Sequence, residues 1–432
     1  MVQDLLKTGG IQMFKKKQHI HAGQNQLSSN GRAFVLPLAL LLIVSLPLAL
    51  LGPQPVRGAM KTEVSPPALK THAQASSLID VASGRIIYAA EGDRELRIAS
   101  LTKIMTAIVA IEHGRLQDQV KVSPTAYAKE GSSLFLRMGE QMTLENMLYG
   151  LMLRSGNDAA SAIAEHVGGT EEGFVHLMNE KAVQLGLSHT HFANPHGLDT
   201  EGHYSSANDM ARLTAYALHN PTFAHIVKTE LKKAPNPNDP WDYSWRNKNK
   251  MLRLYEGADG VKTGYTKKAF RCLVSSATRD GRQLAAVTLN DGDDWNDHAH
   301  MLDYGFQYYP LIPITDKQQP IKGYPLLTGA SFAYPLNDGE KSQLHKRLVL
   351  YKKSRSAGRS DVSFGLRGRV EFLLEGKLIG SVPVYAKGSK LPTPRTIQPG
   401  QEVPTDQAPV SSTQQRSWTS GWSVIIRNLF GV

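Results

Sequence analysis

Residues 97–114 constrain this chain most, because they place a serine and a lysine three residues apart where an apolar helix begins. That spacing puts Ser100 and Lys103 on one helix face. The sequence after Lys103 is almost wholly apolar as far as Ile111, and Gly114 suits a C-cap, so the helix is predicted to be deeply buried. Burial would lower the pKa of Lys103 and let its amine take the Ser100 hydroxyl proton. Taken alone, the pair is more simply explained by an N-capping serine and a surface lysine.

A second short motif lies in the sequence Arg-Ser-Gly-Asn, which contains Ser155 and Asn157. It falls between two predicted helices, residues 143–154 and 157–167, so both polar side chains are expected on a short inter-helix turn. A third motif, Lys262-Thr263-Gly264, precedes two predicted strands joined by the turn sequence Arg-Asp-Gly-Arg. This lysine motif is therefore expected at the edge of a sheet.

The remaining pattern predicts an α/β (α+β) sandwich with the sheet on one face. Residues 78–81 and 86–89 flank a turn and predict a β-hairpin ahead of the serine helix. Further helices are expected over 171–185 and 206–219, and a polar surface loop over 234–245. The returning strands are expected over 272–278 and 283–289.

Three such motifs in this order are far less probable together than any one alone, and their combination resembles the penicillin-binding and serine β-lactamase superfamily. The surrounding sequence is similar to one branch, the D-alanyl-D-alanine carboxypeptidases, strongly over residues 76–310. The phrases that carry the likeness are Ala-Ser-Leu-Thr-Lys-Ile-Met-Thr from Ala99, Leu-Arg-Ser-Gly-Asn-Asp-Ala-Ala from Leu153, Asn-Pro-His-Gly-Leu-Asp from Asn194, Tyr-Ser-Ser-Ala-Asn-Asp-Met from Tyr204, Gly-Ala-Asp-Gly-Val-Lys-Thr-Gly from Gly257 and Asp-Trp-Asn-Asp from Asp294.

The resemblance implies a penicillin-binding/β-lactamase-like fold and a role for each motif residue. Ser100 would attack the bond between the terminal D-alanines of a peptidoglycan stem peptide, with Lys103 as its base. The resemblance implies that Ser155 and Asn157 relay a proton and hold the substrate amide. It also implies that Lys262, Thr263, Gly264 and Tyr265 form the substrate-binding edge, with the Tyr265 N–H in the oxyanion hole. β-Lactam antibiotics would acylate the same serine, and neither a metal nor an organic cofactor is implied.

Two other classes of protein share part of this pattern. A serine β-lactamase would have the same serine and lysines, but no glutamate between Asn157 and Lys262 has the Glu-x-x-Leu-Asn context of the class A enzymes. A non-catalytic wall-binding protein is the second alternative, and the intact motifs count against it.

Several other residues invite a functional interpretation. His196 and Asp199 suggest a Ser-His-Asp triad, but no Gly-x-Ser-x-Gly sequence occurs, so a structural turn near the cleft is favoured. An acidic and histidine cluster could hold a metal or simply open a helix that continues into 301–306; its members are Asp293, Asp294, Asp297, His298 and His300. Cys272 is the only cysteine, which excludes an internal disulfide, and a buried small side chain is favoured over a reactive thiol.

The two ends of the chain carry its basic excess. The balance of charges is +5 over residues 1–58, −3 over 59–310 and +9 over 311–432. Lysines followed by an uncharged run over 33–51 predict an export signal within residues 1–58, with Met13 as an alternative start. The absence of helix-turn-helix, zinc-finger and aromatic RNA-binding patterns argues against a nucleic-acid partner.

The domain organisation follows from these changes in composition. After the export signal we expect a catalytic domain over 59–310, a small all-β domain over 311–387 and a Pro/Gln/Ser/Thr-rich linker over 388–415. At 100° per residue, residues 416–432 place Trp418, Trp422, Ile425, Ile426 and Leu429 on one side and two arginines opposite. We therefore expect an amphipathic C-terminal helix that binds the anionic outer face of the cytoplasmic membrane, with packing on the β domain as the alternative.

Overall fold

The computed structural model describes residues 65–351 and 365–389, and the description is confined to them. The expected signal, linker and C-terminal helix lie outside these residues. No helix in the described part is long and apolar enough to cross a membrane.

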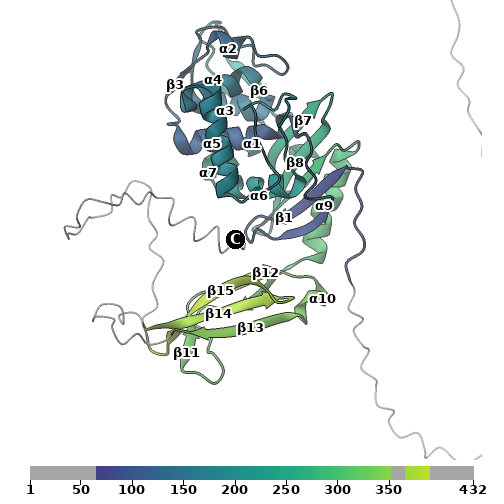
Figure 1. Cartoon of the computed structure of the whole chain (residues 1–432), viewed down its shortest axis with the longest axis vertical. Coiled ribbons are helices and arrows are strands. Elements are labelled where there is room, and N and C mark those ends of the chain that lie inside the picture. The colour runs from purple at the N-terminus through teal and green to yellow at the C-terminus, as the bar shows by residue number, and fades with distance from the viewer. Residues whose placement is uncertain (1–64, 352–364, 390–432) are drawn as a thin grey trace, which may run out of the picture. The chain divides into compact units, whose positions relative to one another are not determined.

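The larger domain is built on a five-stranded antiparallel sheet in the order β2-β1-β9-β8-β7 (Figure 1). Its strands are β1 (Ala75–Asp80), β2 (Ile86–Ala90), β7 (Ala258–Thr266), β8 (Phe270–Arg279) and β9 (Arg282–Leu289). Strands β1 and β2 form the predicted hairpin, and β7 lies at the edge of the sheet, which confirms the expected position of the lysine motif.

The chain between β2 and β7 forms the helical layer. Its helices are the 3-10 helix η1 (Ala99–Thr102), α1 (Lys103–His113), α2 (Pro124–Tyr127), α3 (Leu144–Tyr149), the π-helix η2 (Gly150–Arg154), α4 (Asn157–Gly168), α5 (Glu171–Gln184), α6 (Ala207–Leu218), α7 (Pro221–Lys228) and α8 (Met251–Leu254). Two small antiparallel pairs accompany them, β3 (Gln119–Lys121) with β4 (Gln141–Thr143) and β5 (Leu231–Ala234) with β6 (Tyr243–Arg246).

Two of the predicted helices begin at a residue whose side chain caps the helix N-terminus. Thr143 accepts a hydrogen bond from Asn146 N at the start of α3, and Ser206 accepts one from Asp209 N at the start of α6. The predicted helix 143–154 is present as α3 continued by η2, where the backbone widens into a π-helix that ends with Ser155 in a left-handed conformation. The predicted loop over 234–245 was wrong at both ends, because Ala234 pairs with Tyr243 across β5 and β6.

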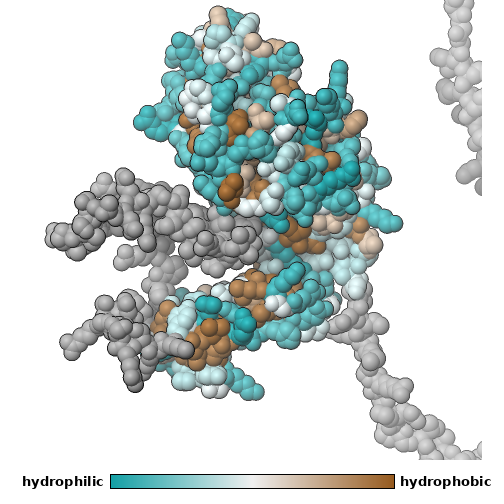
Figure 2. Space-filling view, viewed as in Figure 1, coloured by the Kyte–Doolittle hydropathy of each residue, from teal (hydrophilic) through white to brown (hydrophobic). Residues whose placement is uncertain are grey.

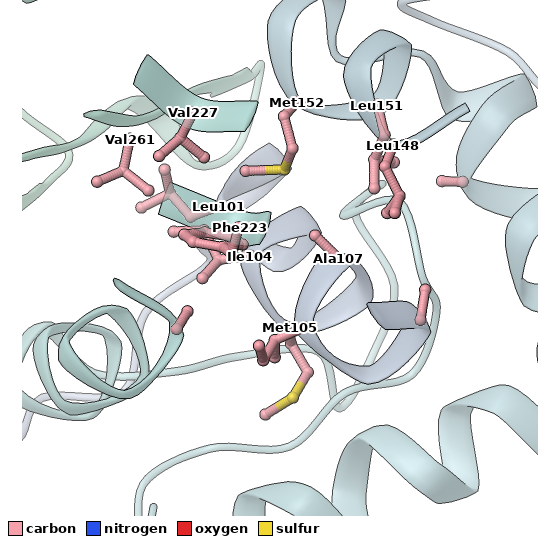
Figure 3. Close-up of a cluster of buried hydrophobic side chains, with 14 of the residues drawn as sticks. Leu101, Ile104, Met105, Ala107, Leu148, Leu151, Met152, Phe223, Val227 and Val261 are labelled. Atoms are coloured by element: carbon pink, nitrogen blue, oxygen red, sulfur yellow. The ribbon is translucent and has the colours of Figure 1, made fainter. Parts of the chain in front are cut away.

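Both faces of the large sheet are buried. The main core lies between the sheet and the helical layer, and Figure 3 shows its centre, where Leu101, Ile104 and Phe223 meet Val261 of β7. Helix α9 (Asp294–Tyr308) covers the other face, where Met301 and Leu302 pack against Leu273 and Leu284. Helix α1 is buried from Lys103 to Ala110, as its apolar sequence predicted.

In its described residues, the smaller domain consists of strands and one helical turn, α10 (Asp338–Lys341), which agrees with the expected small β domain. Strands β11 (Leu326–Thr328), β13 (Leu344–Leu350), β14 (Leu366–Leu374) and β15 (Lys377–Ala386) form a sheet in the order β11-β15-β14-β13. Strands β10 (Leu311–Thr315) and β12 (Phe332–Pro335) form a separate pair. The β14–β15 turn has positive φ at both central residues, Glu375 and Gly376, as a two-residue hairpin requires.

Candidate active site

Ser100 lies in the 3-10 helix η1, which leads directly into α1. Ala99 has a left-handed φ of 47°, and its carbonyl oxygen accepts a hydrogen bond from Thr102 Oγ1 at 2.8 Å. A side chain at Gly197 would collide with that oxygen, so the glycine permits the close approach. Ser100 does not cap the helix, which removes the simplest alternative explanation of the serine–lysine pair.

Lys103 is fully buried, and its amine is surrounded by oxygen atoms. Nζ lies 3.2 Å from Ser100 Oγ, 2.7 Å from Asn157 Oδ1 and 2.5 Å from the His196 carbonyl oxygen. Burial lowers the pKa of Lys103 well below its usual value, and the positive charges of Lys262 and Lys248 lower it further. The environment therefore favours a neutral amine, which has a lone pair and can accept a proton.

The Ser155 and Asn157 side chains come from the turn between η2 and α4. The left-handed backbone of Ser155, with φ of 67°, ends the π-helix and lets Asn157 begin α4. Asn157 joins two parts of the site, because Oδ1 accepts from Lys103 and Nδ2 donates to the Glu130 carbonyl at 2.6 Å. Ser155 is buried, and within the described residues its hydroxyl has no hydrogen-bond partner.

Strand β7 forms the opposite side of the site. A side chain at Gly264 would lie 3.2 Å from the Ser100 nitrogen, so the glycine allows the strand to pass directly beside the serine turn. Lys262 is buried and donates to the Thr263 carbonyl at 2.7 Å, whereas the Tyr265 ring is exposed. Burial, reinforced by the charge of Lys248, lowers the pKa of Lys262 to about 7.

Two polar residues of the site were missed by the sequence analysis, Lys248 and Ser132. Lys248 Nζ donates to Ser132 Oγ at 3.4 Å, and the Ser132 carbonyl accepts from Asn157 N at 2.7 Å. Lys248 is exposed, and its charge lowers the pKa of both active-site lysines. Neither residue belongs to a recognisable sequence motif, so only the folded arrangement reveals them.

The His196 segment is a structural turn, as predicted. Asn194 Oδ1 accepts from Gly197 N at 2.7 Å, and the His196 carbonyl is the group that contacts Lys103. Burial lowers the pKa of His196 to about 3, and Asp199 accepts from Thr266 Oγ1 at 3.0 Å. These contacts differ from those of a Ser-His-Asp triad, in which the imidazole itself must face the serine.

The carboxylates of the acidic cluster after β9 contact different residues. Asp294 pairs with Arg271, and Asp297 accepts from the backbone nitrogen of His72 at 2.6 Å. His298 is fully buried between Ser275 and Thr288, whereas His300 is exposed. Among residues 65–351 and 365–389, the candidate ligand atoms within 4.8 Å of one another belong to His72, Asp293 and Asp297, a different set from the one the sequence suggested.

Cys272 is buried on β8, opposite Gly264. Burial raises the pKa of its thiol to about 12, so the thiolate that reacts is scarce at neutral pH. This confirms the expected small buried side chain.

Comparison with known proteins agrees with the fold and with the order of the motifs. The family described as D-alanyl-D-alanine carboxypeptidase matches residues 60–293. The D-alanyl-D-alanine carboxypeptidase DacF of Bacillus subtilis is 33% identical over 338 residues, which cover 74% of this chain and 86% of the relative. DacC of Escherichia coli, another D-alanyl-D-alanine carboxypeptidase, is 34% identical over 270 residues, covering 59% and 66% of the two chains.

Solved structures of similar fold also include enzymes of this group. Penicillin binding protein 5 from Haemophilus influenzae has a TM-score of 0.60 and 27% identity, covering 76% of this chain and 99% of its own. The DacD carboxypeptidase from Francisella tularensis also has a TM-score of 0.60, at 25% identity, with coverage of 76% and 95%. The fold is thus that of the penicillin-binding class of serine enzymes. The chain belongs to the D-alanyl-D-alanine carboxypeptidase family of serine peptidases.

Proposed function

We propose that Ser100 is the nucleophile of this carboxypeptidase and forms an acyl-enzyme with the peptidoglycan stem peptide. The observation that carries the proposal is the environment of Lys103 Nζ, 3.2 Å from Ser100 Oγ and fully buried. A neutral lysine amine has two N–H groups and one lone pair. With Asn157 Oδ1 and the His196 carbonyl accepting the two N–H groups, the lone pair faces the serine hydroxyl proton.

The remaining steps use the groups around this pair. The N–H groups of Ser100 and Tyr265 stabilise the oxyanion of the tetrahedral intermediate, since Gly264 brings β7 against the serine turn. Ser155, whose hydroxyl is buried without a partner in the described structure, relays the proton to the departing D-alanine amine. Asn157 holds the substrate amide. Water then hydrolyses the ester and restores Ser100.

Recognition of the terminal carboxylate is assigned to Lys262 and Thr263. Both residues lie on the edge strand β7, and an ammonium and a hydroxyl can each donate a hydrogen bond to a carboxylate. Because the pKa of Lys262 is about 7 in the free site, a carboxylate that approaches it favours the charged form. β-Lactams carry a carboxylate and a strained amide, so they are expected to acylate the same serine.

In the cell, removal of terminal D-alanine would limit the number of stem peptides that can form cross-links. We propose that the protein acts outside the cytoplasm after export directed by residues 1–58. Residues 416–432 would bind it to the outer face of the cytoplasmic membrane, by the amphipathic pattern of their sequence.

The decisive experiment incubates purified protein with a stem pentapeptide and, separately, with a fluorescent penicillin. The expected results are D-alanine release and a long-lived adduct on Ser100, with both lost in Ser100→Ala. Lys103→Ala should lose acylation while remaining folded by circular dichroism. Rapid turnover of penicillin without D-alanine release would favour a β-lactamase, and a label that persisted on another serine in Ser100→Ala would refute the assignment.

A further inference from the structure

Phe135 is a large apolar residue in a conformation that such residues rarely adopt. It is 84% exposed and has a left-handed φ of 63°. The conformation is imposed by its neighbours, because buried Asp158 accepts hydrogen bonds from Leu134 N at 2.9 Å and Leu136 N at 3.3 Å. Ser133 Oγ accepts from Phe135 N at 2.8 Å. The fold thus holds the Phe135 ring out in water at a cost in backbone strain, a combination typical of functional sites.

A second loop, tied to the Phe135 loop, carries another exposed aromatic ring. Residues 235–242 connect β5 to β6 and include Trp241, which is 65% exposed. This loop is tied to the Phe135 loop by an ion pair, Arg137 to Asp239 at 2.9 Å, and by a hydrogen bond from Asn238 to buried Glu140 at 2.8 Å. Met138, which is 63% exposed, lies between the two tied positions in the sequence.

These loops border the proposed active site. Ser132, three residues before Phe135, accepts a hydrogen bond from the Asn157 backbone and another from Lys248. Three residues of chain span at most about 11 Å. In a stem pentapeptide, four residues separate the bond to be cleaved from the sugar, and extended they span at most about 14 Å. Phe135 therefore lies within about 11 Å of Ser132, which contacts two residues of the site, and the Trp241 loop is tied to the same segment through Arg137.

Sugar rings suit such a surface because their C–H faces are apolar, whereas their hydroxyl groups need polar partners. Phe and Trp offer large flat apolar faces, and Trp adds an N–H donor. Figure 2 shows that hydrophilic residues cover much of the visible face of the larger domain. Asn236 and Asn238 supply amide groups on the same loop as Trp241.

We propose that the exposed rings of Phe135 and Trp241, here called the aromatic rim, bind the glycan strand to which the stem peptide is attached, together with the exposed Met138 side chain. This inference rests on the proposed function and adds the glycan to the recognised substrate. The rim makes the enzyme prefer D-alanine removal from glycan-linked peptides over removal from free peptides.

The test compares two substrates, a free stem pentapeptide and the same peptide on its disaccharide, with Phe135→Asn and Trp241→Ala. Asparagine tolerates the left-handed backbone, so Phe135→Asn removes the ring without adding strain. Each substitution is expected to lower kcat/KM on the disaccharide substrate about tenfold, as loss of a central aromatic contact does, and to leave the penicillin acylation rate unchanged. Tyr324→Ala, which removes an exposed ring in the β domain, is the matched control.

Equal losses on both substrates, or no loss on either, would overturn the aromatic rim proposal. Calorimetric titration with peptide-free glycan oligomers gives an independent measurement, in which the unaltered protein should bind and Trp241→Ala should bind more weakly. If the unaltered protein released no D-alanine from either substrate, the proposed function would fail, and the titration would still decide whether the rim binds glycan.

Discussion

Asn157 Oδ1 lies 2.7 Å from Lys103 Nζ, although the two residues are 54 positions apart in the sequence. This contact joins the first residue of helix α4 to the first residue of helix α1. Because the same asparagine also donates to the Glu130 carbonyl, its position is fixed from both ends of the amide. The orientation of the proposed base therefore depends on a side chain outside the serine helix.

Asn157→Asp should change the pH dependence of acylation more than it changes the fold. A carboxylate beside Lys103 would favour the charged amine and raise its pKa, so a larger fraction of the enzyme would hold a protonated base at neutral pH. The acid limb of the acylation rate, measured with a fluorescent penicillin, should move to higher pH. Asn157→Ala removes the contact without adding charge and should slow acylation without that shift; identical pH profiles in the two variants would contradict the argument.

Lys262 should control how substrate affinity depends on pH. Its pKa of about 7 in the free site means that the ammonium is progressively lost as the pH rises above 7. The KM for a peptide with a free carboxylate should therefore increase between pH 7 and pH 9. In Lys262→Gln the KM should be high and nearly constant over that range. An amidated peptide should be a poor substrate at every pH, and equal rates on acid and amide would disprove carboxylate recognition by this residue.

The motif residues could be predicted from the sequence because each motif is short and its geometry is local. The serine–lysine spacing fixes one turn of helix, and the edge position of Lys262 follows from the hairpin after it. Lys248 and Ser132 could not be found in this way, because they meet only when two long loops fold against the Ser155 turn. The π-helix before Ser155 was also missed, since its sequence continues the apolar pattern of an α-helix. The first hairpin and the two returning strands of the sheet were predicted, whereas the short pairs β3–β4 and β5–β6 lack any alternation long enough to detect.

Asp158 should contribute strongly to the stability of the Phe135 loop. Its buried carboxylate accepts from two backbone nitrogens of that loop and from Ser133 Oγ at 2.7 Å. The other oxygen, Oδ1, accepts from Leu134 N at 3.0 Å and Ala159 N at 2.9 Å. An asparagine side chain has only one oxygen, so its NH2 group would face buried N–H donors and leave them unpaired, which costs about 1–3 kcal/mol. Asp158→Asn should thus lower the free energy of unfolding in urea, whereas the surface variant Asp118→Asn should change it by less than about 1 kcal/mol. Equal stabilities of the two variants would show that the loop does not depend on this carboxylate.

Buried histidines should make the protein less stable in mild acid. Burial lowers the pKa of His298 to about 3, against about 6.5 when unfolded, so between these values the unfolded chain binds the additional proton. The contribution of His298 to the free energy of unfolding is therefore full above pH 6.5. It falls as the pH decreases below that value, by up to about 1.4 kcal/mol per pH unit.

The free energy of unfolding measured in urea between pH 7.5 and pH 4.5 should show this decline. His298→Gln should reduce the slope, although its stability at pH 7.5 will also be lower because Ser275 and Thr288 lose a partner. His176→Gln, at an exposed position, should retain the full slope. An unchanged slope in His298→Gln would assign the acid sensitivity to other groups.

The C-terminal segment should attach the protein to membranes through one side of a helix. At 100° per residue the two tryptophans at 418 and 422 share a side with three aliphatic residues, and the arginines lie opposite. Deletion of residues 416–432 should leave D-alanine release from a soluble peptide unchanged but abolish sedimentation with anionic vesicles. Trp422→Asp should weaken binding about tenfold or more, because it places a charge among apolar side chains, whereas Ser420→Asp adds the same charge on the polar side and should weaken it much less. If both substitutions reduced vesicle binding equally, the attraction would be one of net charge alone, and the amphipathic helix would be the wrong explanation.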